Sequence, residues 1–226
     1  MGPTNSTLAF SGGNIDDLEV TSESIYPVEG TIGTEIRIPG TGFGIKKGKV
    51  VIESESLGKK LTLKLPNDGW TDTLIKGTIS KALPPGVYDL TVLPKGGPPI
   101  VYRGSFSMKG PEIELISKMN GKYDDIVTVK GKYFGGSGWT VKMHYIDKKN
   151  AKKQWPCEVT NWKWNEATGE SEAEFRVPCN LSKYPHDLTI ANKVGSYVEE
   201  RAFTITEKVA CPAGESGSGP RNDYGW

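Results

Sequence analysis

The three cysteines are the side chains best suited to covalent chemistry in this chain of 226 residues. Segments 155–164 and 171–179 alternate apolar and polar residues and predict a hairpin in which the numbers of opposed residues sum to 336. Cys157 then faces Cys179, and opposed Cβ atoms lie close enough for a disulfide. Two reduced, buried thiols are the alternative. Cys211 is left in the C-terminal tail as a free thiol or as the source of an intermolecular bond.

A disulfide between Cys157 and Cys179 would close a loop of about 20 residues and stabilise the fold by roughly 3 kcal/mol. Such bonds persist outside the reducing cytosol, so the pairing predicts an extracellular or cell-surface location. The first residues of the chain do not form the basic and then apolar run of a secretory signal. The location is therefore inferred from the cysteines.

The sequence contains few residues that could perform acid–base catalysis or bind a metal. His144 and His186 fall in different strand-like segments without a neighbouring serine or cysteine motif, which favours structural roles for both. The acidic pairs at 16–17 and 124–125 lack the regularly spaced oxygen ligands of a calcium loop. Carboxylate pairs for glycoside chemistry meet only in three dimensions, so the sequence leaves them open. We predict a protein that is not an enzyme and that holds no metal or cofactor.

The glycine-rich run 40–44 (Gly-Thr-Gly-Phe-Gly) has two interpretations. A phosphate-binding loop requires a helix N-terminus directly after it, but a turn and a strand follow at 45–52. A sharp turn between strands uses glycine for positive φ values. We therefore predict a turn with Phe43 buried beneath it, and no nucleotide site.

Charge and composition narrow the class of partner. Lys and Arg number 28 against 27 Asp and Glu, so the net charge of +1 lacks the electrostatic footprint of a nucleic-acid binder. The basic run 148–153 is interpreted as the solvated tip of a hairpin, with contact to an anionic surface as the alternative. No stretch approaches the roughly 20 apolar residues that span a bilayer. We expect no nucleic-acid partner and no transmembrane segment.

Short alternating runs dominate the rest of the chain. The 28 glycines and 15 prolines leave few windows long enough for a helix. Runs such as 35–38, 60–65, 88–92 and 126–130 place apolar residues on one face, as a half-buried antiparallel sheet requires. The predicted fold class is all-β.

An internal repeat sets the domain organisation. Residues 25–44 align with residues 116–135 at an offset of 91, which matches Phe43 to Phe134. Near the end of each copy the offset grows to 97 or 98, so the second copy is longer in its middle. The predicted units are an N-terminal tail (1–21), a first domain (22–109), a second domain (110–206) and a C-terminal tail (207–226). The linker between the domains is only a few residues long, which restricts their relative orientation.

Several segments of the first copy occur in the order of a known family. In chain order they are Pro27, Gly30, Gly33, Thr34, the run 40–44, Val50–Ile52, the segment 70–75 and the segment 84–92. This order resembles the IPT/TIG (immunoglobulin-like, plexin, transcription factor) domain and covers nearly all of the first copy. The second copy is more divergent. Asp124 stands in the place of Gly33, and residues 184–187 replace the Pro-Gly-Val-Tyr-Asp turn.

The resemblance implies two tandem immunoglobulin-like β-sandwiches. Domains of this family occur in cell-surface receptors, bacterial surface proteins, starch-active enzymes and the dimerisation parts of transcription factors, and most are spacers or interaction surfaces. Membership would therefore not decide the function. A tryptophan near the position of Trp70 recurs in the family pattern, which implies that at least one of Trp162 and Trp164 is structural.

The predicted hairpin register places Trp162 and Trp164 on the face opposite the cysteines, among charged residues. Two large apolar side chains on a charged face would form a contact surface for a protein or a sugar ring. If the register is shifted by one residue, both side chains are buried instead. Both interpretations stand.

Both tails carry apolar anchors outside the repeats, namely Leu8, Phe10, Tyr224 and Trp226. A sandwich has sheet edges to which an extended segment of a neighbour can add as an extra strand, and a head-to-tail contact that does not close produces a filament. We therefore predict a non-catalytic surface protein that forms a homo-oligomer or filament, or binds another surface protein. The alternatives are a glycan-binding or accessory module of a larger secreted enzyme and, less favoured, a DNA-binding or dimerisation module.

Overall fold

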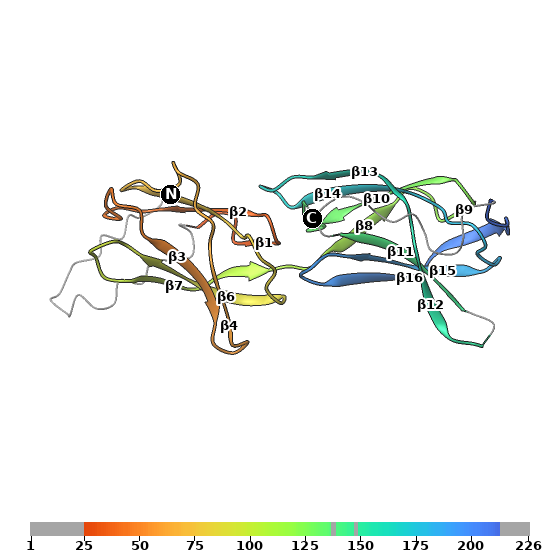
Figure 1. The fold of residues 1–226 in the computed structure, drawn as a ribbon, viewed down its shortest axis with the longest axis horizontal. Coiled ribbons are helices and arrows are strands. Elements are labelled where there is room, and N and C mark those ends of the chain that lie inside the picture. The colour runs from red at the N-terminus through yellow and green to blue at the C-terminus, as the bar shows by residue number, and fades with distance from the viewer. Residues whose placement is uncertain (1–24, 137–138, 147–148, 213–226) are drawn as a thin grey trace, which may run out of the picture.

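The computed structural model describes residues 25–136, 139–146 and 149–212, and every regular element among them is a β-strand (Figure 1). Two modules follow one another along the longest axis of the molecule (Figure 1). Each module encloses its own hydrophobic core between two sheets. The predicted fold, two tandem immunoglobulin-like sandwiches, is confirmed.

The first module packs a five-stranded sheet against a two-stranded one. Its strands are β1 (Glu29–Gly30), β2 (Glu35–Pro39), β3 (Lys49–Ser54), β4 (Lys59–Thr62), β5 (Leu74–Thr78), β6 (Gly86–Leu93) and β7 (Ile100–Met108). The larger sheet has the order β1-β7-β6-β3-β4, and β2 pairs with β5 in the smaller one. Strand β2 shows the predicted alternation, because Ile36 and Ile38 are buried while Arg37 between them is exposed.

The second module has the same plan with a fuller second sheet. Its strands are β8 (Glu112–Ile116), β9 (Asn120–Lys122), β10 (Ile126–Lys132), β11 (Thr140–Ile146), β12 (Lys152–Pro156), β13 (Val159–Trp164), β14 (Glu170–Arg176), β15 (Pro185–Ala191) and β16 (Ser196–Glu207). The sheets have the orders β13-β14-β10-β8 and β12-β11-β15-β16-β9.

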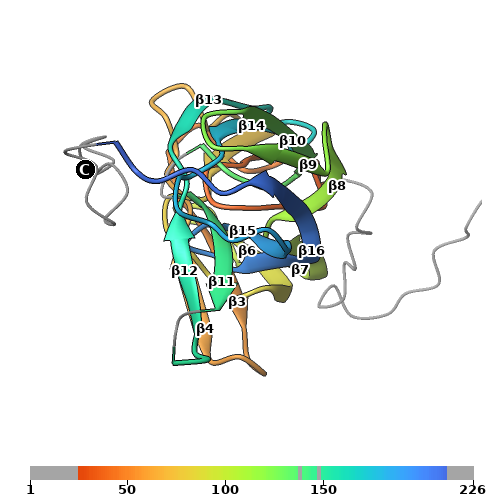
Figure 2. The same ribbon diagram turned by 90° about the vertical axis from the view of Figure 1, so that its right-hand side faces the viewer.

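Strand order and hydrogen bonds match between the modules. The order β1-β7-β6-β3-β4 corresponds to β9-β16-β15-β11-β12, and in each module the first of these strands pairs in parallel with its neighbour. The hairpins β3–β4 and β11–β12 project on the same side of the molecule in both views (Figures 1 and 2). The repeat seen in the sequence is therefore a repeat of the fold.

A corner typical of immunoglobulin-like sandwiches recurs in both modules. The Tyr88 hydroxyl donates a hydrogen bond to the Pro84 carbonyl four residues upstream, over 2.7 Å. In the second module His186 takes the place of Tyr88, and its Nε2 lies 2.9 Å from the Ser182 carbonyl oxygen. His186 is buried, which agrees with the structural role expected for it.

The glycine-rich run 40–44 forms the predicted turn. Gly42 and Gly44 have φ values of 76° and 72°, and Phe43 beneath them is only 2% exposed. Strand β3 follows after a short loop, so no helix N-terminus is present here to bind a phosphate.

The predicted hairpin register is wrong by one residue. Strands β13 and β14 oppose Trp162 to Ala173 and Trp164 to Ser171, so the residue numbers sum to 335 instead of 336. A β-bulge between Val159 and Asn161 shifts the pairing again. Because side chains alternate between faces, this slip turns both tryptophans toward the core side of the sheet.

The predicted disulfide is also wrong. Cys179 is bonded to Cys211 instead of Cys157, with a Cα–Cα distance of 5.0 Å. Cys179 lies beyond the end of β14, where the segment after β16 runs beside it and the Asn180 amide donates to the Val209 carbonyl over 2.7 Å. Cys157 is a free, buried thiol whose pKa is raised by burial. Cys211 is therefore not the intermolecular thiol that was one expectation.

Candidate functional site

The junction between the modules joins distant parts of the chain through side-chain hydrogen bonds and apolar contacts. The turn 31–34 of the first module faces the loop 133–136 that follows β10 in the second. The β15–β16 turn of the second module lies against the linker, and Val194 in that turn packs into the core of the first module. The orientation of the modules is therefore fixed by packing as well as by the short linker.

The Asn192 side chain bonds to five backbone and side-chain groups at this junction. Its Nδ2 donates to the carbonyls of Tyr133 and Phe134 over 2.9 and 3.2 Å, and reaches the Thr31 hydroxyl of the first module over 3.4 Å. Its Oδ1 accepts from the Val194 and Gly195 amides. The Asn192 side chain thus closes the β15–β16 turn and connects this turn to groups of both modules.

A carboxylate and a phenol pair across the junction. The Tyr133 hydroxyl donates to Glu29 Oε1, and Lys109 lies 3.5 Å from the other oxygen of the same carboxylate. The hydrogen bond from Tyr133 lowers the pKa of Glu29, against an opposing effect of burial and with help from Lys109. Burial and the bond to Glu29 raise the pKa of Tyr133. Both shifts keep the phenol protonated and the carboxylate charged at neutral pH.

Trp164 covers two glycines at the junction. A Cβ atom at Gly33 would lie 2.8 Å from the indole ring, and one at Gly136 would lie 3.1 Å from it, so only glycine leaves room for the ring at the first of these positions. Gly33 also has a φ of 96°, which other residues rarely adopt. Trp164 is therefore part of the contact between modules and does not present its ring as a free platform.

Trp162 is a structural residue of the second module. Its ring stacks on Trp139 with centroids 3.8 Å apart, and its Nε1 donates to the Gly135 carbonyl over 2.8 Å. In the first module Trp70 makes the same bond to the Gly44 carbonyl over 2.9 Å. The interpretation of a register shifted by one residue, with both tryptophans turned inward, is the one that the structure supports.

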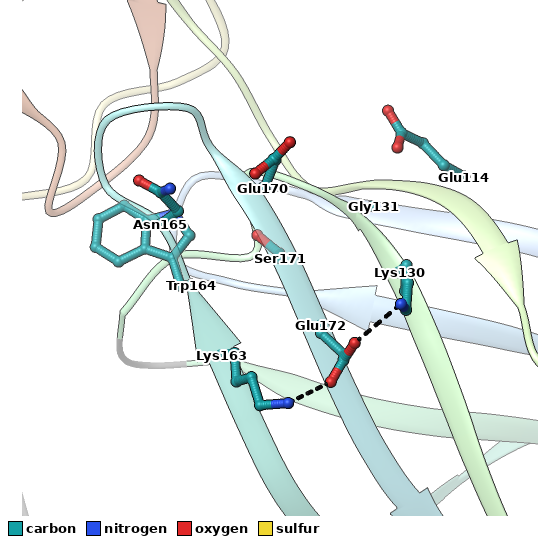
Figure 3. A pocket seen from close by; sticks show the side chains of 9 residues that line it. All are labelled: Glu114, Lys130, Gly131, Lys163, Trp164, Asn165, Glu170, Ser171 and Glu172. Atoms are coloured by element: carbon teal, nitrogen blue, oxygen red, sulfur yellow. Dashed lines mark hydrogen bonds and ion pairs between the residues drawn. The ribbon is translucent and has the colours of Figure 1, made fainter.

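A hollow lies on the outer face of the four-stranded sheet, beside the junction (Figure 3). Its volume is about 490 Å³. Glu172 lies at its centre between two lysines, 2.7 Å from Lys163 and 3.3 Å from Lys130. Asn165 and Glu170 line the end nearest the first module (Figure 3). These groups can donate to and accept from hydroxyls, and the half-buried Trp164 lines the hollow beside them (Figure 3).

The remaining residues considered from the sequence lie apart from this region. His144 is buried on β11, with Nε2 2.5 Å from the Thr189 hydroxyl oxygen. Leu8, Phe10, Tyr224 and Trp226 lie outside the described residues. Among the residues that the structure does describe, no three or more His, Cys, Asp or Glu side chains gather as metal ligands would. Within the same ranges, no helix has the length and hydropathy needed to cross a bilayer.

Sequence reasoning missed Asn192 and Tyr133. Both follow strands in loops, where no periodic pattern marks a residue as a contact. No signal in the sequence marks either residue as part of a contact between modules.

No protein-family model and no curated protein matches the chain. Similar solved structures include a surface glycan-binding protein from Prevotella bryantii, with 15% identity, coverage of 77% of this chain and 40% of that one, and a TM-score of 0.33. A chain of the complex between Dpr2 Ig1-Ig2 and DIP-Theta Ig1-Ig3 has 12% identity, 84% and 63% coverage, and a TM-score of 0.25. The titin fragment I67-I69 has 12% identity, 79% and 62% coverage, and a TM-score of 0.23. This chain thus spans less than two thirds of each structure.

Proposed function

We propose that this chain is a non-catalytic structural and interaction protein of the cell surface or extracellular space, built from two IPT/TIG-type modules, that self-assembles into a homopolymer. The observation that carries the proposal is the junction, where Asn192, Tyr133 and Trp164 hold the modules in one orientation. A stiff unit of this kind suits a spacer or a polymer subunit better than a hinged clamp around a substrate. The disulfide between Cys179 and Cys211 favours an oxidising compartment.

The sheet edges of the two modules give assembly through a tail a place to act. In the second module β8 covers the edge of β10 that is equivalent to the edge of β2, with Ser117 N donating to Thr128 O over 2.8 Å. In the first module the described part of the corresponding pair is the bridge between Tyr26 and Arg37, and residues 21–24, which align with the start of β8, lie outside the described residues. Charged residues on other edge strands, for example Lys59 and Lys60 on β4, oppose the addition of a strand there. An N-terminal segment, with its apolar Leu8 and Phe10, would add to a sheet edge of a neighbouring chain as an extra strand.

The test is truncation of the full chain. Removal of residues 1–18 or 213–226 keeps both modules and Cys211, and we expect each truncated chain to sediment as a monomer with an unchanged β-sheet circular dichroism spectrum. The intact chain is the control and should assemble under the same conditions. Assembly of both truncated chains to the same extent as the intact chain would contradict the role of the tails.

A glycan-binding or accessory module is the second candidate, and the hollow at Glu172 favours it. Carboxylates, an amide and lysines lie within one depression, and such groups can hydrogen-bond sugar hydroxyls (Figure 3). A glycan array with the wild-type chain and the Glu170→Ala variant tests it. Binding of a defined glycan that the variant loses would support this candidate, and an array without signal would dismiss it.

A further inference from the structure

The loop that the second module turns toward the first has a counterpart in the fold at the free end of the first module. Gly135 and Gly44 are equivalent, because each carbonyl accepts the indole hydrogen bond of the corresponding tryptophan. The next residues, Gly136 and Ile45, are therefore equivalent as well. Gly136 lies at the junction beneath Trp164. Ile45 lies at the end of the molecule away from the junction, because β2 leads from the turn 31–34 to that end (Figure 1).

Ile45 is exposed to an unusual degree. Its side chain is 89% exposed, the highest value among the large apolar residues that the structure describes. It projects from a loop that the hydrogen bonds from the Gly44 amide to Asp72 and from Trp70 to the Gly44 carbonyl hold in place. A fixed, exposed isoleucine at the end of an elongated molecule suits a contact anchor, since burying it on a partner removes its apolar surface from water.

The first module contributes the turn 31–34 to the junction, and the equivalent turn of the second module lies at the opposite end of the molecule. The turn 122–125 corresponds to the turn 31–34 of the first module. Both turns are closed in the same way, by a bond from the Thr31 amide to the Thr34 hydroxyl and from the Lys122 amide to the Asp125 carboxylate. Asp124 has a φ of 72°, in the same left-handed region as Gly33.

Exposed apolar side chains lie beside this second turn. Met119 just before β9 is 65% exposed, and Ile126 at the start of β10 is 37% exposed. The first module has the charged Glu35 in the place of Ile126. Both free ends of the molecule thus carry exposed apolar side chains. Val28, the counterpart of Met119 in the first module, is also exposed, at 49%, so Ile45 and Ile126 are the apolar residues particular to the ends.

We propose that the junction repeats between chains, with the Ile45 loop of one copy docked on the turn 122–125 of the next. This inference rests on the proposed self-assembly and adds a contact between the folded ends of two copies to the contact made by the tails. The Ile45 loop and the turn 122–125 are different surfaces at opposite ends of the molecule. The contact between them is therefore heterologous, and it adds copies in one direction without closing a ring. The occupant of each end is a second copy of this chain.

The first test is charge insertion at the anchor. Ile45→Asp should raise the concentration needed for assembly at least tenfold, measured by sedimentation velocity, because the contact would bury an unpaired carboxylate. Val87→Asp is the matched control, since Val87 is 57% exposed on β6, away from both ends, and should assemble like the wild type. Equal assembly of the Ile45→Asp chain and the wild type would overturn the proposal.

The second test is directional cross-linking with a short bis-maleimide. Chains carrying Ile45→Cys are mixed with chains carrying Lys122→Cys, while the native cysteines are bonded or buried. Cross-linked dimers should form in the mixture and in neither variant alone. Dimers of Ile45→Cys alone would show an end-to-end symmetric contact and overturn the proposal. A wild-type chain that stays monomeric would overturn self-assembly itself, whereas a wild-type polymer without mixed cross-links would overturn this contact only.

Discussion

At the residue scale, the cysteines show where sequence reasoning stops. The residue types alone indicated a disulfide, and one exists, but the partner of Cys179 came from a segment that has no pattern to place it. Cys211 follows β16 by a few residues, and it is the topology of the sandwich that brings this segment to the loop after β14. Which cysteines form a disulfide depends on their positions in the tertiary structure, and the register of a predicted hairpin does not give these positions.

The pairing predicts a simple count of reactive thiols. Under native, non-reducing conditions no thiol should react with a maleimide, because Cys157 is buried and the other two are bonded. In urea one thiol should react, and after reduction all three. Labelling followed by peptide mapping measures both number and position. Modification of Cys211 in unreduced urea would contradict the pairing.

Removal of the disulfide should destabilise the second module. The bond spans 32 residues and encloses β15 and β16, so in the chain-entropy account its loss costs about 3.7 kcal/mol. We expect the double variant C179S/C211S to unfold at a lower urea concentration, and the C157A variant, which keeps the bond, to lose less. The urea midpoint by tryptophan fluorescence is the measurement. Equal midpoints for C179S/C211S and the wild type would refute the stabilising role.

His144 predicts a pH dependence of stability. Burial lowers its pKa, Lys152 and Lys142 lower it further, and Asp187 opposes them. The unfolded chain, with a histidine pKa of about 6.5, therefore binds more protons in weak acid than the folded one. The contribution of neutral His144 is complete above that pH and decreases as the pH falls. The urea midpoint should drop between pH 7.5 and pH 5.0, and His144→Gln should reduce this drop. An unchanged slope in the variant would contradict the assignment.

At the scale of elements, the sequence predicted strands well and register poorly. Alternation in runs such as β2 reflects a face that is buried over its whole length, so it is visible locally. The register of β13 against β14 at Trp162 is set by the turn 165–169, and a bulge between Val159 and Asn161 shifts it once more; neither leaves a mark on the alternation. A slip of one residue reverses the faces, and the expected position of Trp162 changed with it.

Both modules contain a hydrogen bond from a tryptophan indole to a glycine carbonyl, Trp70 to Gly44 in the first and Trp162 to Gly135 in the second. Trp162→Phe should keep most of the ring contact with Phe134 but leave the Gly135 carbonyl without its donor. We expect a loss of about 1 kcal/mol in the free energy of unfolding of the second module. Trp70→Phe is the matched variant and should cost the first module a similar amount. A neutral effect of both substitutions would show that water replaces the bond.

At the scale of the whole molecule, the junction could not be foreseen from the sequence. The repeat indicated two modules and a short linker, but Asn192 and Tyr133 are single polar residues in loops. Val194 is counted in the second module by chain order and packs in the core of the first. The modules are therefore coupled in energy as well as in orientation, which chain order alone does not reveal.

Separated modules test this coupling. Fragments 22–109 and 110–212, the second extended to keep Cys211, should each fold and unfold cooperatively, because each has a complete set of strands. The first fragment should be less stable than the same module in the intact chain, since it loses Val194. Calorimetry of both fragments and of the intact chain gives the comparison. An unfolded first fragment would mean that the two modules share one core.

Self-assembly of a stiff two-module unit is the central claim, and the mass of the intact chain in solution tests it most directly. Sedimentation velocity over a wide range of protein concentration, without reductant, measures this mass. The account predicts species that grow with concentration well beyond a dimer and appear as filaments by electron microscopy, because a heterologous contact does not close. A single species of 24.6 kDa at every concentration would contradict it.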